Sequence, residues 1–353
     1  MTVRCVERET RETIAVTFDV PEGLRERFRF TQGQFLTLRA FVDGEELRRS
    51  YSICAAPHEG DLRIAIKRAA AGRFSRWAHE TFAPGTPIDI APPQGRFHVP
   101  LAPAACRHYL GFAAGSGITP LLSIVKAVLA GEPRSRFTLV YGNRASSTTM
   151  FRRELQALKD RYLARFALVF VMSREPQDIE LFSGRIDRAK CDALLEAWID
   201  PATVDVAFLC GPPEMMRAAE GSLRAHGVAA ERIKTERFAS GPPATERPPI
   251  ASEEGVEAEI CRAYAILDGR RREFTIRKGK ETFLDAGLRQ GIDLPFSCKG
   301  GVCSTCRVLL VEGEVDMDVH YALEDYEIAR GFILMCQSYP ATSVVGVDAD
   351  IHA

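Results

Sequence analysis

The segment Leu294-Pro-Phe-Ser-Cys298-Lys-Gly-Gly-Val-Cys303-Ser-Thr-Cys306 decides how the rest of the chain is interpreted. Its three cysteines follow the spacing C-x4-C-x2-C, and a fourth comes after twenty-nine further residues. This is the ligand spacing of a plant-type [2Fe–2S] cluster. The sequence therefore predicts a chain that carries electrons, with four cluster ligands: Cys298, Cys303, Cys306 and Cys336.

The neighbours of these cysteines support a cluster over two alternatives. Gly300 and Gly301 let the backbone turn tightly around a bulky inorganic core, because glycine has no Cβ. A structural zinc site usually pairs its ligands in two C-x2-C units, which this triplet does not match. A disulfide framework is typical of small secreted chains, and nothing marks this long chain for secretion.

Composition describes an ordinary globular protein. With 353 residues, two or three domains are expected. No apolar run approaches the roughly eighteen residues of a membrane span, and the first ten residues lack the apolar core of a signal peptide, so we expect a cytoplasmic protein. Residues 251–353 hold 11 basic and 18 acidic side chains, whereas the remainder holds 35 and 29. This asymmetry fits either a docking surface or a plain acidic surface.

Residues 1–103 have the pattern of an antiparallel β-barrel. Segments 13–20, 34–39 and 62–67 alternate apolar and polar residues with period two, and glycines and prolines separate them. Within this region lies Arg49-Ser50-Tyr51-Ser52, in which an arginine can neutralise a phosphate and a tyrosine can stack on a flat ring. Gly72-Arg-Phe74-Ser75 then opens a short helix, whose first amides form an anion site.

Residues 104–238 alternate strands and helices, which predicts a doubly wound parallel sheet. Strands are expected at 108–114, 137–141, 166–172 and 204–210, and helices at 121–129, 150–162, 189–198 and 213–226. The loop Gly115-Ser-Gly117-Ile-Thr119-Pro120 follows the first strand and is not the usual G-x-G-x-x-G. Its amides and the following helix would still face a pyrophosphate.

A proline-rich stretch, residues 239–256, is expected to be a linker. Residues 257–353 then predict an α+β domain of the β-grasp type around the cysteine loop. A hairpin is expected around Asp268-Gly269, and a helix at 282–290 is expected to stop at Gly291.

Taken together, these motifs resemble those of the ferredoxin–NADP reductase family. The order of barrel, nucleotide domain and ferredoxin domain narrows the likeness to oxygenase reductases. Further segments, Glu45–Cys54, Ala114–Pro120, Tyr141–Arg144 and Ser183–Asp187, resemble the reductase subunits of phenylacetyl-CoA epoxidases. The likeness covers essentially the whole chain.

The resemblance implies roles for individual residues. The expected flavin contacts are Arg49, Tyr51, Ser52, Ile66, Lys67, Gly72, Phe74, Ser75 and Phe238. The expected nucleotide contacts are Gly115, Gly117, Thr119, Arg144, Ser173, Arg174, Cys210, Gly211 and Pro212. The residues expected to shape hydride transfer are Ser52, Thr119, Cys210 and Glu236.

The implied activity is electron transfer from NADPH through FAD and the [2Fe–2S] cluster to a di-iron oxygenase, with phenylacetyl-CoA epoxidase as the expected partner and no nucleic acid or membrane partner. Ser173-Arg174 favours NADPH over NADH, because a guanidinium suits a 2′-phosphate. The residues alone leave FMN open beside FAD. Two alternatives remain: a reductase for a Rieske-type aromatic or steroid hydroxylase, and a non-catalytic redox carrier or sensor.

Overall fold

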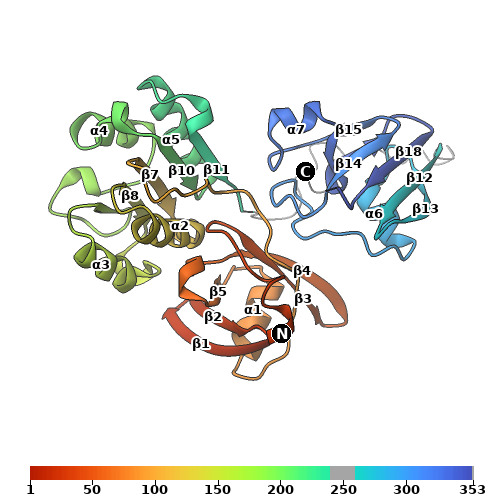
Figure 1. Cartoon of the computed structure of the whole chain (residues 1–353), viewed down its shortest axis with the longest axis horizontal. Helices are drawn as coiled ribbons and strands as arrows, with labels where there is room; N and C mark the ends of the chain where they lie inside the picture. Colours follow the sequence, from red (N-terminus) through yellow and green to blue (C-terminus); the bar gives the residue numbers. More distant parts are fainter. Residues whose placement is uncertain (239–258, 352–353) are drawn as a thin grey trace. The chain divides into compact units, whose positions relative to one another are not determined.

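The computed structural model describes residues 1–238 and 259–351. The chain divides into two compact units, Met1–Glu236 and Arg237–Ala353 (Figure 1). The expected linker at 239–256 lies outside the described residues, as do the first two residues expected for the C-terminal domain. Within the two described ranges, no helix has both the length and the apolar character needed to cross a bilayer.

The first part of unit Met1–Glu236 contains two three-stranded antiparallel sheets around one apolar core. One sheet has the order β1-β2-β5 and the other the order β4-β3-β6. A bridge between Ile53 and Ile64 joins them, and the alternating apolar residues predicted for this region fill the interior. The bounds are β1 (Thr2–Thr10), β2 (Thr13–Asp19), β3 (Phe35–Val42), β4 (Glu45–Ser52), β5 (Leu62–Lys67) and β6 (Asp89–Ile90).

One helix, α1 (Arg73–Thr81), closes this barrel-like domain and begins after Gly72, as the sequence predicts. It buries Phe74 and Ala78 against the barrel core.

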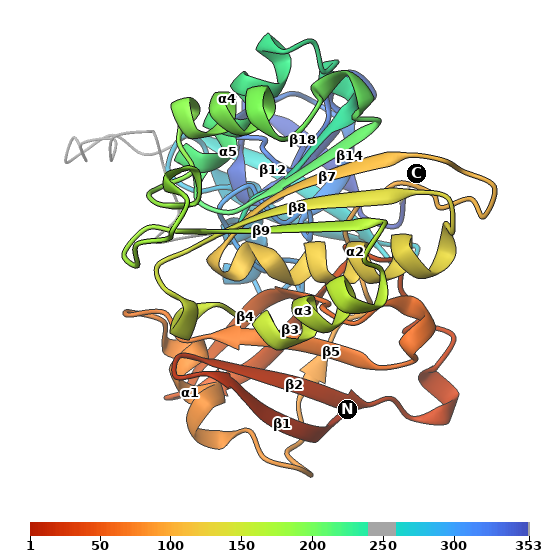
Figure 2. The same cartoon turned by 90° about the vertical axis from the view of Figure 1, so that its left-hand side faces the viewer.

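The second part of the same unit is a five-stranded parallel sheet with the order β11-β10-β7-β8-β9. The strands are β7 (His108–Ala114), β8 (Arg136–Asn143), β9 (Phe166–Met172), β10 (Val206–Cys210) and β11 (Ile233–Glu236). Helices cover both faces, α2 and α3 on one side and α4 and α5 on the other (Figure 2). Their bounds are α2 (Ile118–Gly131), α3 (Arg152–Arg161), α4 (Arg188–Ala197) and α5 (Pro213–Ala225).

This strand order has its topological switch point between β7 and β10. Open α/β sheets bind ligands beyond the carboxyl ends of the strands at such a point. Helix α2 begins at Ile118, three residues earlier than the predicted start, because a 3-10 turn over Gly115–Gly117 leads directly into it. The glycine loop therefore sits at the switch point, tightly joined to the helix.

The described part of unit Arg237–Ala353 has the expected β-grasp arrangement. Its main sheet has the order β13-β12-β18-β14-β16, with β15 and β17 as a separate pair. The strands are β12 (Ile260–Leu267), β13 (Arg270–Arg277), β14 (Arg307–Glu312), β15 (Val315–Met317), β16 (Phe332–Leu334), β17 (Ser338–Pro340) and β18 (Val344–Asp348). The helices are α6 (Phe283–Arg289) and α7 (Asp325–Ala329).

Local sequence signals explain this unit's framework. Asp268 and Gly269 both have positive φ angles, 50° and 69°, as a type I′ turn between β12 and β13 requires. The Thr282 hydroxyl caps α6 by accepting a hydrogen bond from the Asp285 amide, and Gly291, with φ of 80°, follows the helix end. Phe283 and Leu284 of α6 pack with Phe274 in the core of the unit. The loop that carries the first three cysteines follows this helix along the chain.

Candidate functional site

Strand β4 presents the side chains that were predicted to contact a flavin. Arg49 is exposed, Tyr51 is half-buried and Ser52 is buried. The Tyr51 ring lies 5.9 Å from the Phe74 ring, measured between centroids, so β4 and the start of α1 meet here. Burial raises the pKa of Tyr51, and its hydroxyl therefore stays protonated at neutral pH.

The loop between β5 and α1 has a fixed internal geometry. The Ser75 hydroxyl accepts a hydrogen bond from the Ala69 amide at 3.1 Å and donates one to the Gly72 carbonyl at 3.1 Å. A Cβ on Gly72 would lie 2.5 Å from the Ser75 oxygen and 2.8 Å from the Ala69 Cβ, so a larger residue would force this loop to shift. Two further predicted flavin contacts, Ile66 and Lys67, end the strand that enters this loop.

The glycine loop after β7 packs directly against the end of β10. A Cβ on Gly117 would lie 2.1 Å from the carbonyl oxygen of Cys210 and 2.9 Å from the amide nitrogen of Gly211. Tyr141, at the carboxyl end of β8, donates a hydrogen bond to the Gly115 carbonyl at 2.9 Å. Thr119 lies in the first turn of α2, where its hydroxyl donates to the Ser116 carbonyl at 2.9 Å.

Three of the four residues predicted to shape hydride transfer meet at the boundary between the barrel and the sheet. Cys210 and Glu236 are register partners at the carboxyl ends of β10 and β11. The Ser52 hydroxyl, from β4, donates a hydrogen bond to Glu236 at 3.2 Å. The fourth residue, Thr119, follows Gly117 by two positions in the chain, and Gly117 packs against the Cys210 carbonyl.

Burial controls protonation at this place. It raises the pKa of Glu236 to about 8, from an ordinary value of 4.5, although the hydrogen bond from Ser52 opposes the shift. Burial, and secondarily the neighbouring Glu236, also raise the pKa of Cys210, which stays a thiol. Glu236 and Cys210 are therefore mostly uncharged at neutral pH, and Glu236 can hold a proton beside the buried Ser52 hydroxyl.

Replacing Glu236 with glutamine is expected to change how stability depends on pH. Between pH 4.5 and pH 8 the folded chain holds a proton on Glu236 that the unfolded chain has lost, so the parent loses stability as pH rises through this window. The free energy of unfolding of the variant, relative to that of the parent, should rise by at least about 1.4 kcal/mol between pH 5 and pH 8, the equivalent of one pKa unit. Urea unfolding of the flavin-loaded protein at pH 5, 7 and 9 measures it.

The exposed Glu231 offers a control for this measurement, as the Glu231→Gln variant. A difference between Glu236→Gln and parent that stays constant from pH 5 to pH 9 would show that the Glu236 carboxyl titrates normally.

An ionic network around the buried Lys126, which sequence reasoning missed, ties the barrel to the helices of the sheet. The Lys126 ammonium, on α2, lies 3.0 Å from Glu59 and also contacts Glu154, which pairs with Arg63 at 3.1 Å. One turn earlier, the Ser123 hydroxyl donates to the Ala55 carbonyl at 2.6 Å. These contacts hold α2 against the segment that follows β4. A serine and a lysine within an otherwise apolar helix were the available signal.

The residues predicted to bind the far end of the nucleotide also come together. The Ser173 amide donates to the Asn143 carbonyl at 2.9 Å, and the Arg174 amide donates to the Arg144 carbonyl at 2.8 Å. Arg144, Ser173 and Arg174 are all exposed at the carboxyl ends of β8 and β9.

Two predicted nucleotide contacts lie beyond β10, and one predicted flavin contact lies at the end of the described segment. Gly211 and Pro212 follow β10 and lead into α5. Phe238 is half-buried and belongs to the second unit by the division after Glu236, so its place near a flavin stays a prediction.

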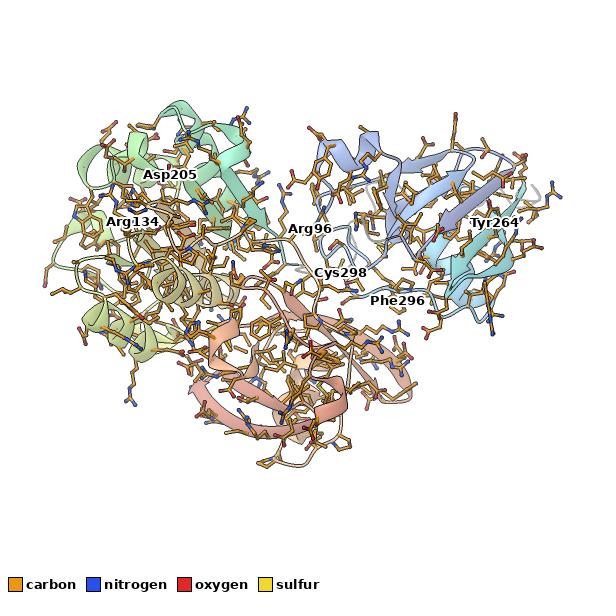
Figure 3. All side chains as sticks on the ribbon, in the orientation of Figure 1. Arg96, Arg134, Asp205, Tyr264, Phe296 and Cys298 are labelled. Carbon is orange, nitrogen blue, oxygen red and sulfur yellow. The ribbon has the colours of Figure 1, made fainter. Side chains whose placement is uncertain are left out.

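The four predicted ligand cysteines converge in the second unit. The side chain of Cys298 interacts with those of Cys303 and Cys336, and the side chain of Cys306 interacts with that of Cys336. Cys298 lies on the loop after α6, at the other side of this unit from Tyr264 on β12 (Figure 3). Contacts with Cys303 and Cys336 lower the pKa of Cys298.

The loop geometry fits an inorganic core. Lys299, Gly301 and Ser304 have positive φ angles of 53°, 71° and 51°, and the Gly300 amide points at the Cys298 sulfur at 3.3 Å. Four neighbouring sulfurs, with the Gly300 amide aimed at that of Cys298, suit a [2Fe–2S] cluster.

Comparisons with known proteins agree with this division of the chain. The oxidoreductase FAD-binding domain family matches residues 1–99, the oxidoreductase NAD-binding domain family matches residues 112–221, and the 2Fe-2S iron-sulfur cluster binding domain family matches residues 265–341. One of the subunits of the 1,2-phenylacetyl-CoA epoxidase from Escherichia coli K12 is 45% identical, over 99% of this chain and 97% of its own.

A second relative shares the whole length as well. The ferredoxin reductase component of the Rhodococcus rhodochrous 3-ketosteroid-9-alpha-monooxygenase is 32% identical, over 99% of this chain and 96% of its own. The chain belongs to this family of oxygenase reductases. The reductase is therefore an oxidoreductase with FAD-binding, pyridine-nucleotide-binding and [2Fe–2S]-binding domains, and the predicted three-part fold class is confirmed.

Solved structures share the fold of the reductase. Phthalate dioxygenase reductase aligns with a TM-score of 0.60 and 23% identity, over 98% of this chain and 96% of its own. An intact type IV self-sufficient cytochrome P450 monooxygenase aligns with a TM-score of 0.68 and 20% identity, over 98% of this chain and 40% of that chain.

Proposed function

We propose that the reductase takes electrons from NADPH and delivers them, through FAD and the [2Fe–2S] cluster, to the oxygenase component of a phenylacetyl-CoA epoxidase. The main support for electron transfer from the nucleotide to the flavin is the hydrogen bond from Ser52 to Glu236, the register partner of Cys210. This bond joins β4, the strand with the predicted flavin contacts, to the edge of the sheet where a nucleotide is expected to bind. When bound, FAD accepts a hydride from the nucleotide and passes electrons singly to a one-electron acceptor.

The residues divide this work by position. Tyr51 offers a flat, half-buried ring, and Arg49 offers an exposed cation for a phosphate. Gly117 brings the nucleotide loop against the Cys210–Gly211 peptide, so that a nicotinamide ring bound there would face the side of the barrel that holds Ser52. Glu236 holds a proton at this boundary, and Thr119 fixes the first turn of α2 through Ser116.

We assign these functions to four segments with the boundaries expected from the sequence. Residues 1–103 bind FAD, residues 104–238 bind the nucleotide, residues 239–256 link the domains and residues 257–353 hold the cluster. The matches of the three domain families to residues 1–99, 112–221 and 265–341 support this assignment.

The preference for NADPH rests on the three exposed residues at the ends of β8 and β9. Arg144 and Arg174 bring two guanidinium groups to one edge, and backbone hydrogen bonds hold the two loops together. A 2′-phosphate suits such a pair, because guanidinium groups bind phosphate through charge-assisted hydrogen bonds.

Replacing Arg174 with glutamine is expected to raise the KM for NADPH about 10- to 100-fold, because one charge-assisted hydrogen bond contributes about 1.5–3 kcal/mol. The KM for NADH should change less than about twofold. Steady-state reduction of ferricyanide with each nucleotide gives both values, and Arg153→Gln on the exposed face of α3 is the matched control. Equal effects on the two nucleotides would place the phosphate elsewhere.

The proposed partner follows from the sequence relationship. The chain is 45% identical to one component of an epoxidase and 32% identical to one component of a ketosteroid monooxygenase, with both relatives aligned over almost their full length. The higher identity favours a phenylacetyl-CoA epoxidase over a steroid hydroxylase as the partner of the reductase.

A replacement experiment tests the partner. The purified reductase would take the place of its 45% identical relative in the Escherichia coli epoxidase, and oxidation of phenylacetyl-CoA would be measured with NADPH. Turnover that depends on the reductase is expected. If the reductase reduces ferricyanide normally but supports no oxidation of phenylacetyl-CoA, while it does support a ketosteroid monooxygenase, the partner assignment is wrong.

A further inference from the structure

Gln337 follows the last of the four cysteines and is almost completely buried, with 3% of its surface exposed. It ends the 3-10 turn Met335–Gln337 and directly precedes β17. Its Cγ lies 3.2 Å from the place where a Cβ on Gly301 would stand, so the side chain packs against the cysteine loop.

The Gln337 amide joins the segment of the fourth cysteine to the loop of the first. Its Nε2 donates hydrogen bonds to the carbonyl oxygens of Lys299, at 2.9 Å, and Cys336, at 3.0 Å. Because both partners are acceptors, the NH2 group must face them, which fixes the orientation of the amide. The Oε1 atom is then buried with no hydrogen-bond partner in the described part of the chain. Such an orphaned oxygen is costly, so apolar packing alone does not account for a glutamine here.

The bond to Lys299 controls more than one carbonyl. The Lys299 carbonyl and the Gly300 amide belong to the same planar peptide group, so they point in opposite directions from it. Fixing the oxygen toward Gln337 therefore fixes the Gly300 N–H toward the Cys298 sulfur, 3.3 Å away. Lys299 has a φ of 53°, a left-handed conformation that a lysine adopts only when its surroundings hold it there.

We infer that Gln337 is a positioning residue for the cluster: it clamps the Lys299–Gly300 peptide so that the Gly300 amide stays aimed at the Cys298 ligand. Hydrogen bonds to the sulfurs set the potential of an iron–sulfur cluster. A donor at the Cys298 sulfur stabilises the added negative charge of the reduced cluster, so the clamp raises the reduction potential. The inference rests on the proposed [2Fe–2S] function of the four cysteines.

Gln337→Met tests the clamp, because methionine matches the length of glutamine and removes both donors. We expect the variant to keep its cluster and to be harder to reduce, with the one-electron equilibrium constant lowered about three- to tenfold, up to about 59 mV. The exchangeable-proton hyperfine coupling at the reduced cluster should weaken with it. Redox titration and electron paramagnetic resonance of the full chain measure the two effects.

Gln290 gives a matched control within the same unit. Its Nε2 also donates to two backbone carbonyls, those of Thr275 at 2.7 Å and Ala286 at 3.0 Å, but it does so at the end of α6. Gln290→Met should therefore leave the potential unchanged. In a second variant, Gln337→Glu, a carboxylate oxygen replaces Nε2 and faces the carbonyl oxygens of Lys299 and Cys336. This variant should lower the reduction potential further than Gln337→Met does.

The outcomes separate this inference from the function on which it rests. A parent chain that binds no [2Fe–2S] cluster would overturn the proposed function itself. A parent that binds the cluster, with an unchanged potential in Gln337→Met or Gln337→Glu, would overturn the clamp alone. Loss of the cluster from both Gln337 variants but not from Gln290→Met would also overturn it, since Gln337 would then serve assembly and not potential.

Discussion

Cys336→Ala is expected to yield a reductase that still oxidises NADPH but passes electrons to its oxygenase more than about 100-fold more slowly. Loss of a supporting contact around a metal site typically costs 10- to 100-fold in affinity or activity, and loss of a ligand removes more. Cys336 meets both Cys298 and Cys306, so its removal breaks the convergence of the four sulfurs at two points. Iron analysis and the visible spectrum would show the loss of the cluster.

Cys261→Ala is the matched control for this prediction. Cys261 is a fully buried cysteine of the same unit, on β12, and the four-cysteine group does not include it. That variant should keep its iron and its rate of electron delivery. Flavin reduction by NADPH should be the same in both variants, because the predicted flavin and nucleotide contacts, apart from Phe238, belong to the other unit. If Cys336→Ala retained a full cluster, the ligand assignment would be wrong.

Gly117→Ala is expected to slow flavin reduction by NADPH at least about 100-fold. The new Cβ would lie 2.1 Å from the Cys210 carbonyl oxygen and 2.5 Å from its carbonyl carbon. Both are backbone atoms, so no side-chain rotation relieves the contact and the two loops must move apart. A misplacement of about 1 Å at a reacting centre costs about 100-fold in rate. Stopped-flow absorbance of the flavin bands under anaerobic conditions measures it.

Gly131→Ala, at the end of the same helix, separates this effect from a general loss of stability. A Cβ on Gly131 would meet only Leu101, at 3.6 Å, which is an ordinary contact. This variant should reduce its flavin at the parental rate and unfold at the same or a slightly higher temperature, because alanine favours helix over glycine by up to about 1 kcal/mol. Parental flavin reduction in Gly117→Ala would contradict the close approach of the two loops.

Local signals predicted most of the fold. The Asp268-Gly269 turn, the glycine after α6 and the alternation of strands 13–19 and 62–67 each depend on residues close together in the chain, and the structure confirms them. The start of α2 was predicted three residues late, since nothing in the sequence distinguishes a 3-10 turn over Gly115–Gly117 from a loop.

Which site residues contact one another was harder to predict than which residues belong to the site. Family resemblance named Ser52 and Glu236, but no local rule joins two residues that lie 184 positions apart. The pairing of Lys126 with Glu59 and Glu154 was missed for the same reason, because the partners of a buried lysine are known only after the helices have packed. Gln337 gave no signal in the sequence, since its role depends on the peptide that it contacts.

An anaerobic absorbance titration of the purified reductase, with NADPH and separately with NADH, tests the central claim most directly. We predict that the flavin bands bleach first and the iron–sulfur features follow, faster with NADPH than with NADH. A protein that shows the colour of a cluster, contains no flavin and responds to neither nucleotide would contradict the account, and would instead support a non-catalytic redox carrier.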